Sequence, residues 1–266
     1  MSRLRDLPWR HTRDPWAILV SEVMLQQTHV RRVVPKWHAF MDEFPTAASC
    51  AAAPLGDVLR AWQGLGYPRR AKNLHATATR VTELGTFPDT LDGLLALPGV
   101  GQYTARALLA FAFESDAAVV DTNIARVYAR HAGRALKPRE VQRLADAASP
   151  AGDAWAWNQC LMDLGAMLCR PANPACVECP LRSECAWVRD GGDDPAVGSA
   201  GVSRTQAPFA GSDREARGAL MRASGVGCIT DLAGAAQCAP ERALGLALAL
   251  EAEGLLRRTT SGWTLP

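Results

Sequence analysis

The sequence predicts a mostly α-helical protein with a small winged-helix-like unit at its C-terminal end. Through about residue 190, apolar residues recur at helical spacing, alternating strand patterns are nearly absent, and breaks containing Gly or Pro separate the periodic stretches. The chain has 266 residues, 48% of them hydrophobic and 21% charged, which is an ordinary globular composition with ample material for a core.

The first helix is expected over 16–30, where apolar residues follow the i, i+3, i+4, i+7 rule and Asp14-Pro15 supplies a start signal. Glu22 falls on the side opposite the apolar stripe, so the pattern alone predicts a solvated glutamate. Further helical patterns occur at 31–44, 55–64, 70–84, 89–96 and 102–113, from about Asp121, and at 153–168.

Residues 189–207 are dominated by Gly, Asp, Ser, Ala and Pro with little periodicity, which predicts a flexible linker. Three helices are then expected at 212–223, 229–236 and 239–254, followed by a hairpin that turns at Ser261-Gly262. Three helices and a hairpin are the order of a winged helix, so 208–266 is predicted to be a winged-helix-like domain.

The charge is unevenly distributed along the chain. Lys and Arg outnumber Asp and Glu by 12 to 6 in residues 1–80, whereas the remaining residues carry 17 against 21. A local basic surface suits a protein that contacts phosphates with one face. The N-terminus lacks an apolar signal segment, and no run of about 18 uncharged apolar residues occurs, so we expect a cytoplasmic protein without membrane association.

Eight cysteines occur, and four of them crowd into the pattern C-x6-C-x2-C-x5-C at Cys169, Cys176, Cys179 and Cys185. In an intracellular chain such a cluster indicates metal binding rather than disulfides. Four thiolates suit either zinc or a [4Fe–4S] cluster, and zinc ribbons tend to pair two C-x2-C knuckles, of which only one is present. The other four cysteines look like scattered small hydrophobes.

The segment Leu97-Pro98-Gly99-Val100-Gly101 lies between two helical patterns. Two glycines around one apolar residue allow a tight turn whose exposed amides, at a helix N-terminus, bind a phosphate. A plain turn between two helices is the alternative.

Followed by Gln102 and Tyr103, this segment resembles the hairpin of the helix-hairpin-helix DNA glycosylases. The cysteine spacing resembles the cluster loop of endonuclease III and its relatives. Three strings, at 5–10, 21–28 and 162–167, resemble the adenine DNA glycosylases of the MutY family, and the match covers 1–188. The resemblance implies a glycosylase core over 1–188, with a six-helix module at about 16–120 and a cluster module from 1–15 and 121–188.

The resemblance also implies the cofactor and the catalytic residues. The cofactor is a [4Fe–4S] cluster on the four crowded cysteines, with Arg170 and Arg182 near DNA phosphates. Glu22 falls on the general acid that protonates adenine N7. Asp121, otherwise a plain helix N-cap, falls on the carboxylate that stabilises an oxocarbenium-like state. Asn123 matches a residue that positions the acid and water, and Tyr103 stands where bifunctional relatives carry a lysine.

Further positions match DNA-contacting residues of the family. Leu7, Trp9, Arg10 and Val30 match the surroundings of the flipped adenine, and Gln27 matches a wedge into the duplex. The remaining predicted DNA contacts are Arg5, Tyr67, Gly99, Gly101 and Gln102. Two departures stand out: Pro68 replaces a second tyrosine that intercalates beside 8-oxoguanine, and 208–266 has no evident likeness to the family's Nudix-like reader of that lesion.

We therefore expect a monomeric, monofunctional glycosylase that removes adenine opposite 8-oxoguanine or guanine in double-stranded DNA and leaves an abasic site. No lysine lies between Lys72 and Lys137, so the nucleophile of a lyase is missing from this stretch. A thymine or uracil mismatch glycosylase and a noncatalytic DNA-damage-binding protein are the alternatives.

Overall fold

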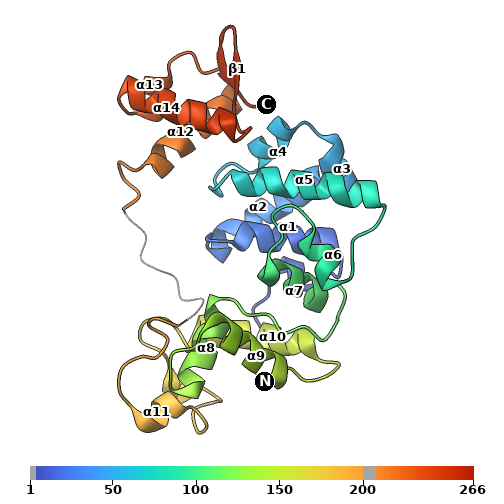
Figure 1. Ribbon diagram of the computed structural model, residues 1–266, viewed down its shortest axis with the longest axis vertical. Helices are drawn as coiled ribbons and strands as arrows, with labels where there is room; N and C mark the ends of the chain where they lie inside the picture. The colour runs from blue at the N-terminus through green and yellow to red at the C-terminus, as the bar shows by residue number, and fades with distance from the viewer. Residues whose placement is uncertain (1–3, 200–207) are drawn as a thin grey trace. The chain divides into compact units, whose positions relative to one another are not determined.

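The computed structural model describes residues 4–199 and 208–266, and it confirms the predicted mostly α-helical class (Figure 1). The first helices are α1 (Pro15–Leu25), α2 (Val30–Glu43), α3 (Ala47–Ala52), α4 (Leu55–Ala61), α5 (Arg69–Leu84), α6 (Leu91–Leu95) and α7 (Gln102–Phe111). They are followed by α8 (Thr122–Ala132), α9 (Pro138–Ala148), α10 (Ala154–Asp163), α11 (Ala186–Asp190), α12 (Asp213–Val226), α13 (Leu232–Ala236) and α14 (Pro240–Ala252). The strands β1 (Arg257–Thr259) and β2 (Gly262–Thr264) end the chain.

The chain forms two compact units, each built from separate stretches of sequence. Of the described residues, unit 1 comprises 4–18, 89–95 and 100–199, and unit 2 comprises 19–88, 96–99 and 208–266. These boundaries differ from the modules expected from the resemblance, because α7 belongs to unit 1 and the C-terminal helices belong to unit 2.

Helix α1 is buried on every side rather than along one stripe. All residues from Trp16 to Met24 are buried, including Ser21 and Glu22. The predicted solvated face is therefore wrong, because neighbouring segments cover the side that the apolar spacing leaves polar. The helix also ends five residues before the expected Val30, ahead of a turn in which Gln27 has a φ of 57°.

Three helices, α3, α9 and α11, were missing from the sequence prediction. Helix α3 is only six residues long, and it is fixed by a reciprocal capping box between Thr46 and Ser49. Helix α9 begins at Pro138 and has a strongly polar outer face, while Val141 and Ala145 are buried. Short length and sparse apolar residues explain why periodicity did not reveal them.

The last stretch of unit 2 has three helices and a hairpin, as expected for 208–266. Strands β1 and β2 pair antiparallel, with Arg258 opposite Trp263, and Ile229 adds a bridge to Trp263. The turn residues are 260 and 261, one residue earlier than expected. Within unit 2, Gln63 donates to the carbonyl of Met221 at 3.3 Å, which joins α12 to the end of α4.

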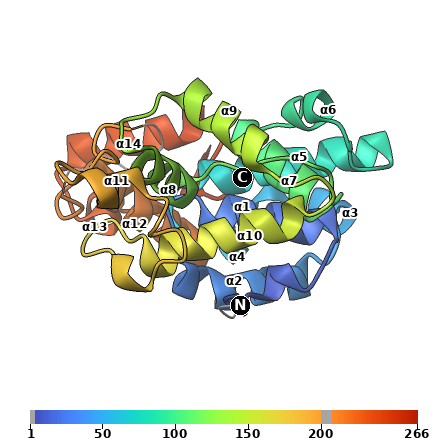
Figure 2. The ribbon, with the colours of Figure 1, turned by 90° about the horizontal axis from the view of Figure 1, so that it is seen from below.

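Unit 1 is built around α8, which lies beside α9, α10 and α11 (Figure 2). Its apolar core cluster consists of Ala125, Ala129, Leu136, Val141 and Ala196. None of the helices in the two described ranges combines the length and the apolar character that a bilayer crossing requires.

The prediction of a flexible linker over 189–207 is wrong for residues 189–199. Asp194 pairs with the guanidinium of Arg130 on α8, at 2.6 Å between Oδ2 and Nη2. Ala196 joins the core cluster, and the hydroxyl of Ser199 accepts a hydrogen bond from the amide of Leu136 at 3.0 Å. Residues 189–199 therefore belong to unit 1, while 200–207 lie outside the described residues.

Candidate active site and cluster loop

Glu22 lies in the centre of α1 and is only 5% exposed. Its backbone belongs to unit 2, whereas the other predicted catalytic residues, Tyr103, Asp121 and Asn123, belong to unit 1. Removing a carboxyl group from water costs free energy that a purely structural surface glutamate would not incur. The burial of Glu22 therefore contradicts the solvated position that its helical spacing predicts.

Asp121 is the N-cap of α8. Its Oδ1 accepts a hydrogen bond from the amide of Ile124 at 2.7 Å, and its Oδ2 accepts one from the side-chain amide of Asn123 at 2.8 Å. Burial raises the pKa of Asp121, and the two hydrogen bonds together with the charge of Arg126 offset this only in part. The expected cap is thus present, and it holds the carboxylate in a fixed orientation.

Arg126 connects this carboxylate to the cysteine loop. Its Nη2 donates to the side-chain oxygen of Asn123 at 2.9 Å and to the carbonyl of Gly165 at 2.6 Å, and its Nε donates to the carbonyl of Cys169 at 2.6 Å. Gly165 lies so close to Asn123 that an added Cβ would sit 2.7 Å from the Asn123 Cβ. The π-helical turn at 164–168 brings these carbonyls to Arg126.

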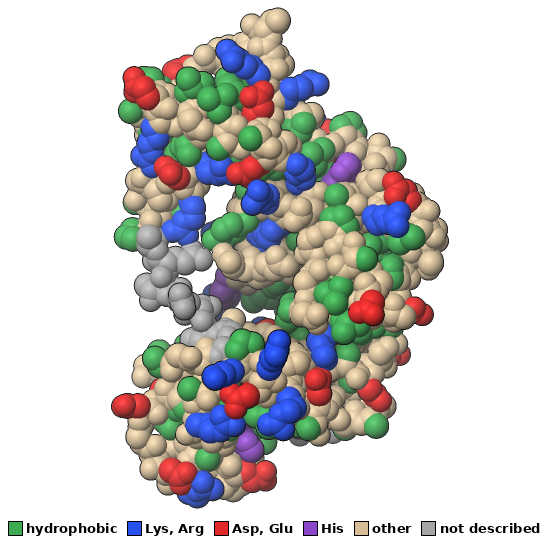
Figure 3. Space-filling view, viewed as in Figure 1, with side chains coloured by type: hydrophobic (Ala, Val, Ile, Leu, Met, Phe, Trp, Pro, Cys, Tyr) green, Lys and Arg blue, Asp and Glu red, His purple; other side chains and the backbone are tan. Residues whose placement is uncertain are grey.

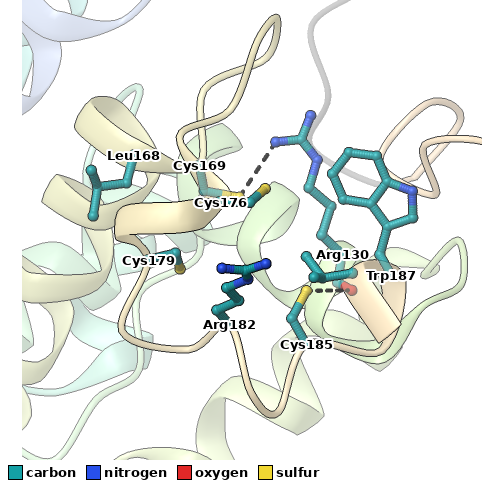
Figure 4. Close-up of a pocket in the computed structure, with 9 residues that line it drawn as sticks. Arg130, Leu168, Cys169, Cys176, Cys179, Arg182, Cys185 and Trp187 are labelled. Carbon is teal, nitrogen blue, oxygen red and sulfur yellow. Dashed lines mark hydrogen bonds between the residues drawn. The ribbon is translucent and has the colours of Figure 1, made fainter. Parts of the chain in front are cut away.

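The four clustered cysteines line a single pocket (Figure 4). Cys169 follows the π-helical turn, Cys176 begins a short 3-10 turn, and Cys185 is the N-cap of α11. The pocket is lined by Cys169, Cys176, Cys179, Cys185, Arg130, Leu168, Arg182, Trp187 and Val188. All eight cysteines of the chain are free thiols, and the other four lie away from this pocket.

Arg130 closes one side of the pocket and is 2% exposed. Its Nη1 donates to the sulfur of Cys169 at 3.4 Å, while the thiol of Cys185 donates to the Arg130 carbonyl at 3.4 Å (Figure 4). The guanidinium also stacks over the Trp187 ring, 4.8 Å from its centroid. Desolvation lowers the pKa of Arg130, but Asp194 and Cys169 outweigh this and raise it, so a permanent positive charge faces the thiols.

These residues fit a [4Fe–4S] cluster. Four thiols supply the full ligand set of such a cluster. The positive guanidiniums of Arg130 and Arg182 line the same pocket, where they would offset the negative charge of the thiolate ligands. In the described ranges, no three His, Cys, Asp or Glu side chains are close enough together to hold one metal ion. A four-iron cluster does not need that closeness, because each thiolate binds a different iron.

The two arginines of the N-terminal segment 5–10 form ion pairs within unit 1. Arg10 is 7% exposed and forms a two-pronged pair with Asp163, with both N···O distances at 2.8 Å. Arg5 donates to the same carboxylate through Nε at 2.6 Å, and these arginines hold the pKa of Asp163 below its usual value despite the opposing effect of burial. Leu7 and Trp9 are buried. Of these four predicted substrate or DNA contacts, the two arginines thus tie the segment to the last residue of α10, and the two apolar side chains are buried.

The predicted hairpin is formed by 97–102. Gly99 has a φ of 74°, and an added Cβ would lie 2.7 Å from the Cβ of Asn73, so a side chain is excluded there. Gly101 is the N-cap of α7 and has open space around it, and Gln102 is exposed. Tyr103 follows in the first turn of α7 and is half-buried.

Gln27 and Tyr67 lie on two turns of unit 2. Both are exposed, and both have left-handed backbone conformations, with φ of 57° and 48°. Val30, half-buried, begins α2 in the same unit.

Sequence reasoning missed four charged residues that organise these segments, namely Arg70, Arg126, Arg130 and Asp163. The spacing of four between Arg126 and Arg130, which puts them on one face of α8, was the only available signal.

Comparison with known proteins places the chain among repair enzymes. The family model described as "HhH-GPD superfamily base excision DNA repair protein" matches residues 20–150. The adenine DNA glycosylase of Mycolicibacterium smegmatis is 45% identical over 82% of this chain and 74% of its own length. That of Mycobacterium tuberculosis strain H37Rv is 43% identical, over 82% and 73% respectively. A solved thermostable thymine-DNA glycosylase is 30% identical over 70% of this chain and 89% of its own, with a TM-score of 0.65.

Proposed function

This chain belongs to the HhH-GPD superfamily of base excision DNA repair proteins, as an adenine DNA glycosylase, and on that premise we propose that it hydrolyses the N-glycosidic bond of adenine mispaired with 8-oxoguanine or guanine. The observation that carries the proposal is the pair of desolvated carboxyl groups, Glu22 and Asp121, at the two positions that the resemblance predicts. The product is an abasic site in an otherwise intact strand.

Glu22 is the proposed general acid. Adenine leaves poorly as an anion, and a proton delivered to its N7 turns it into a good leaving group. A positioned acid typically contributes a factor of about 10²–10⁴. The extrusion of adenine from the base stack is required, because its reacting atoms are inaccessible inside the duplex.

Asp121 is the proposed stabiliser of the cationic sugar. With Ile124 and Asn123 holding its oxygens, the carboxylate needs no reorganisation as positive charge develops on the sugar ring. Asn123 positions the carboxylate, and Tyr103 is the proposed neighbour on the sugar side. Because Tyr103 stands where lyases carry a lysine, water is the proposed nucleophile and the enzyme is monofunctional.

The proposed cofactor is a [4Fe–4S] cluster on Cys169, Cys176, Cys179 and Cys185. When bound, the cluster orders the loop 169–185 rather than taking part in excision. Arg170 and Arg182 on this loop are the proposed phosphate contacts. Figure 3 shows Lys and Arg side chains interspersed with Asp and Glu, so the support for binding to double-stranded DNA with a mismatched or oxidised pair is the excess of Lys and Arg in residues 1–80. We propose a monomer that acts in the cytoplasm, at the nucleoid.

The proposal is tested by single-turnover excision on duplexes that carry adenine, thymine, uracil or hypoxanthine opposite guanine, 8-oxoguanine or cytosine. We expect adenine release opposite 8-oxoguanine and guanine. Glu22→Gln should slow this release by at least about a hundredfold while duplex binding persists, because the acid acts in the transition state. A covalent enzyme–DNA adduct trapped by borohydride on the wild type contradicts monofunctional hydrolysis.

A thymine or uracil mismatch glycosylase is the second candidate. The 30% identity with a thymine-DNA glycosylase favours it, and Tyr103 and Asp121 serve that reaction equally well. Faster release of thymine or uracil than of adenine from the same panel of duplexes would establish this alternative. A wild-type protein that binds these duplexes and releases no base would indicate the noncatalytic binding protein.

A further inference from the structure

Arg70, in the first turn of α5, ties two exposed turns of unit 2 together. One nitrogen of its guanidinium, Nη1, donates to the carbonyls of Val23 at 2.7 Å, Met24 at 3.1 Å and Gln26 at 2.6 Å. The other, Nη2, donates to the Thr28 hydroxyl at 3.1 Å and to the carbonyls of Leu65 at 3.0 Å and Gly66 at 3.1 Å. One side chain therefore satisfies the end of α1 and the loop before α5 at the same time.

Each of these turns carries one strained, exposed residue. Gln27 and Tyr67 have φ of 57° and 48°, in the left-handed region that side chains other than glycine rarely adopt. Such conformations persist only where the surroundings determine them, and they gather at functional sites. The hydroxyl of Thr28 also donates to the Leu65 carbonyl at 3.2 Å, so the two turns are joined directly as well.

Arg70 also fixes the aromatic side chains of the loop. Its guanidinium lies over the rings of Tyr67 and Trp62, 5.4 Å from each centroid. The Trp62 indole in turn donates to the Gly66 carbonyl at 3.1 Å. Because Pro68 follows, Tyr67 is the one aromatic residue of the sequence 63–68, and it is 39% exposed. An exposed ring and an exposed amide on stiff turns suit stacking on bases and insertion between them.

We propose that Arg70 is a positioning residue for base extrusion, which holds Gln27 and Tyr67 as one rigid pair that enters the duplex as adenine leaves the stack. This inference rests on the proposed glycosylase function. The planar guanidinium can hold both turns because its two terminal nitrogens point to different segments. The ammonium of a lysine is a single point and cannot serve six acceptors in two segments.

The test compares two substrates in single-turnover excision. In the first, adenine is paired opposite 8-oxoguanine, and in the second it lies unpaired in a bulge, where little pairing has to be broken. For Arg70→Lys we expect excision of the paired adenine to fall at least about tenfold, because extrusion is the impaired step. Excision of the bulged adenine should stay within about twofold of wild type. Arg69→Lys, the neighbouring and largely exposed arginine, is the matched control and should resemble wild type on both substrates.

A second readout does not depend on excision. With 2-aminopurine in place of the target adenine, the rise in fluorescence that follows unstacking should be lost in Arg70→Lys and kept in Glu22→Gln. If Arg70→Lys fails to fold, Thr28→Val removes the direct link between the turns together with one of the six acceptors of Arg70. It should show the same difference between the two substrates, but a smaller one. Equal losses on both substrates, or no loss on either, would overturn the inference. If the wild type releases no adenine from either substrate, the proposed function fails instead.

Discussion

Asp121 performs two tasks with one carboxylate. Its Oδ1 caps α8 and its Oδ2 receives the Asn123 amide, so the geometry that stabilises the helix also aims the negative charge. Burial raises the pKa of this group, while the hydrogen bonds from the Ile124 amide and from Asn123 lower it. The same two hydrogen bonds therefore hold the carboxylate in place and favour its charged form.

This arrangement makes a prediction about pH. Excision needs the charged form of Asp121, so the rate should fall as pH drops through a pKa that lies above the ordinary aspartate value. Asn123→Ala removes a hydrogen bond that lowers this pKa, so the acid limb of the single-turnover pH–rate profile should move to higher pH. Thr122→Ala, an exposed neighbour on α8, should leave the limb in place. An unchanged limb in Asn123→Ala would contradict the assignment of the charge to Asp121.

At the scale of elements, the two glycines of the hairpin 97–102 differ in how well they should tolerate a side chain. Gly99→Ala combines a positive φ with a Cβ that would sit 2.7 Å from Asn73, so it should lower the free energy of unfolding by about 1–3 kcal/mol. Gly101→Ala meets open space at a φ of −98° and should be far less destabilising. Thermal denaturation of both variants measures the difference, and equal losses of stability would show that the contact with Asn73 relaxes freely.

The cluster loop is an element that lacks a packed core of its own. Wild-type protein is expected to be brown, with about four irons per chain. Cys176→Ser should lose iron and duplex affinity, because the loop folds around the metal. Cys228→Ser is the matched control, since that thiol is exposed and lies outside the pocket. Zinc in stoichiometric amount, or full iron content in Cys176→Ser, would contradict the cofactor proposal.

For the whole molecule, a C-terminal truncation tests the role of 208–266 only if it leaves unit 1 intact. A chain ending at residue 190 loses Asp194, Ala196 and Ser199, which complete unit 1, whereas a chain ending at 199 keeps them. We expect the chain ending at 199 to retain adenine excision opposite guanine, with weaker duplex binding and less preference for 8-oxoguanine. The chain ending at 190 should lose thermal stability as well.

Binding titrations at matched salt and excision ratios for the two opposite bases measure these effects. In 208–266, Arg217 is held by Glu253 through two hydrogen bonds, whereas Arg257 and Arg258 on the hairpin are exposed, so we expect these two arginines to contact DNA phosphates. Full affinity and an unchanged preference ratio in the chain ending at 199 would show that 208–266 does not read the lesion.

Sequence patterns predicted most of the helices, the C-terminal hairpin and the four clustered cysteines, because periodicity and spacing are local signals. They did not reveal contacts between residues that lie far apart in the sequence. The segment 191–199 reads as a linker, yet Arg130, 64 residues before Asp194, orders it. Arg70 and Arg126 bond mainly to backbone carbonyls, which any residue can supply, so their partners leave no mark in the sequence.

The division of unit 2 between 19–88 and 208–266 imposes an order on folding during synthesis. Helix α4 leaves the ribosome early, but its Gly56 packs against the carbonyl of Pro266, which is synthesised about 210 residues later. At about 5–20 residues per second, that partner follows about 10–40 s later. Throughout this interval the nascent chain carries an incomplete surface on α4. Translation speed and chaperone access should therefore influence the yield of this protein more than its equilibrium stability suggests.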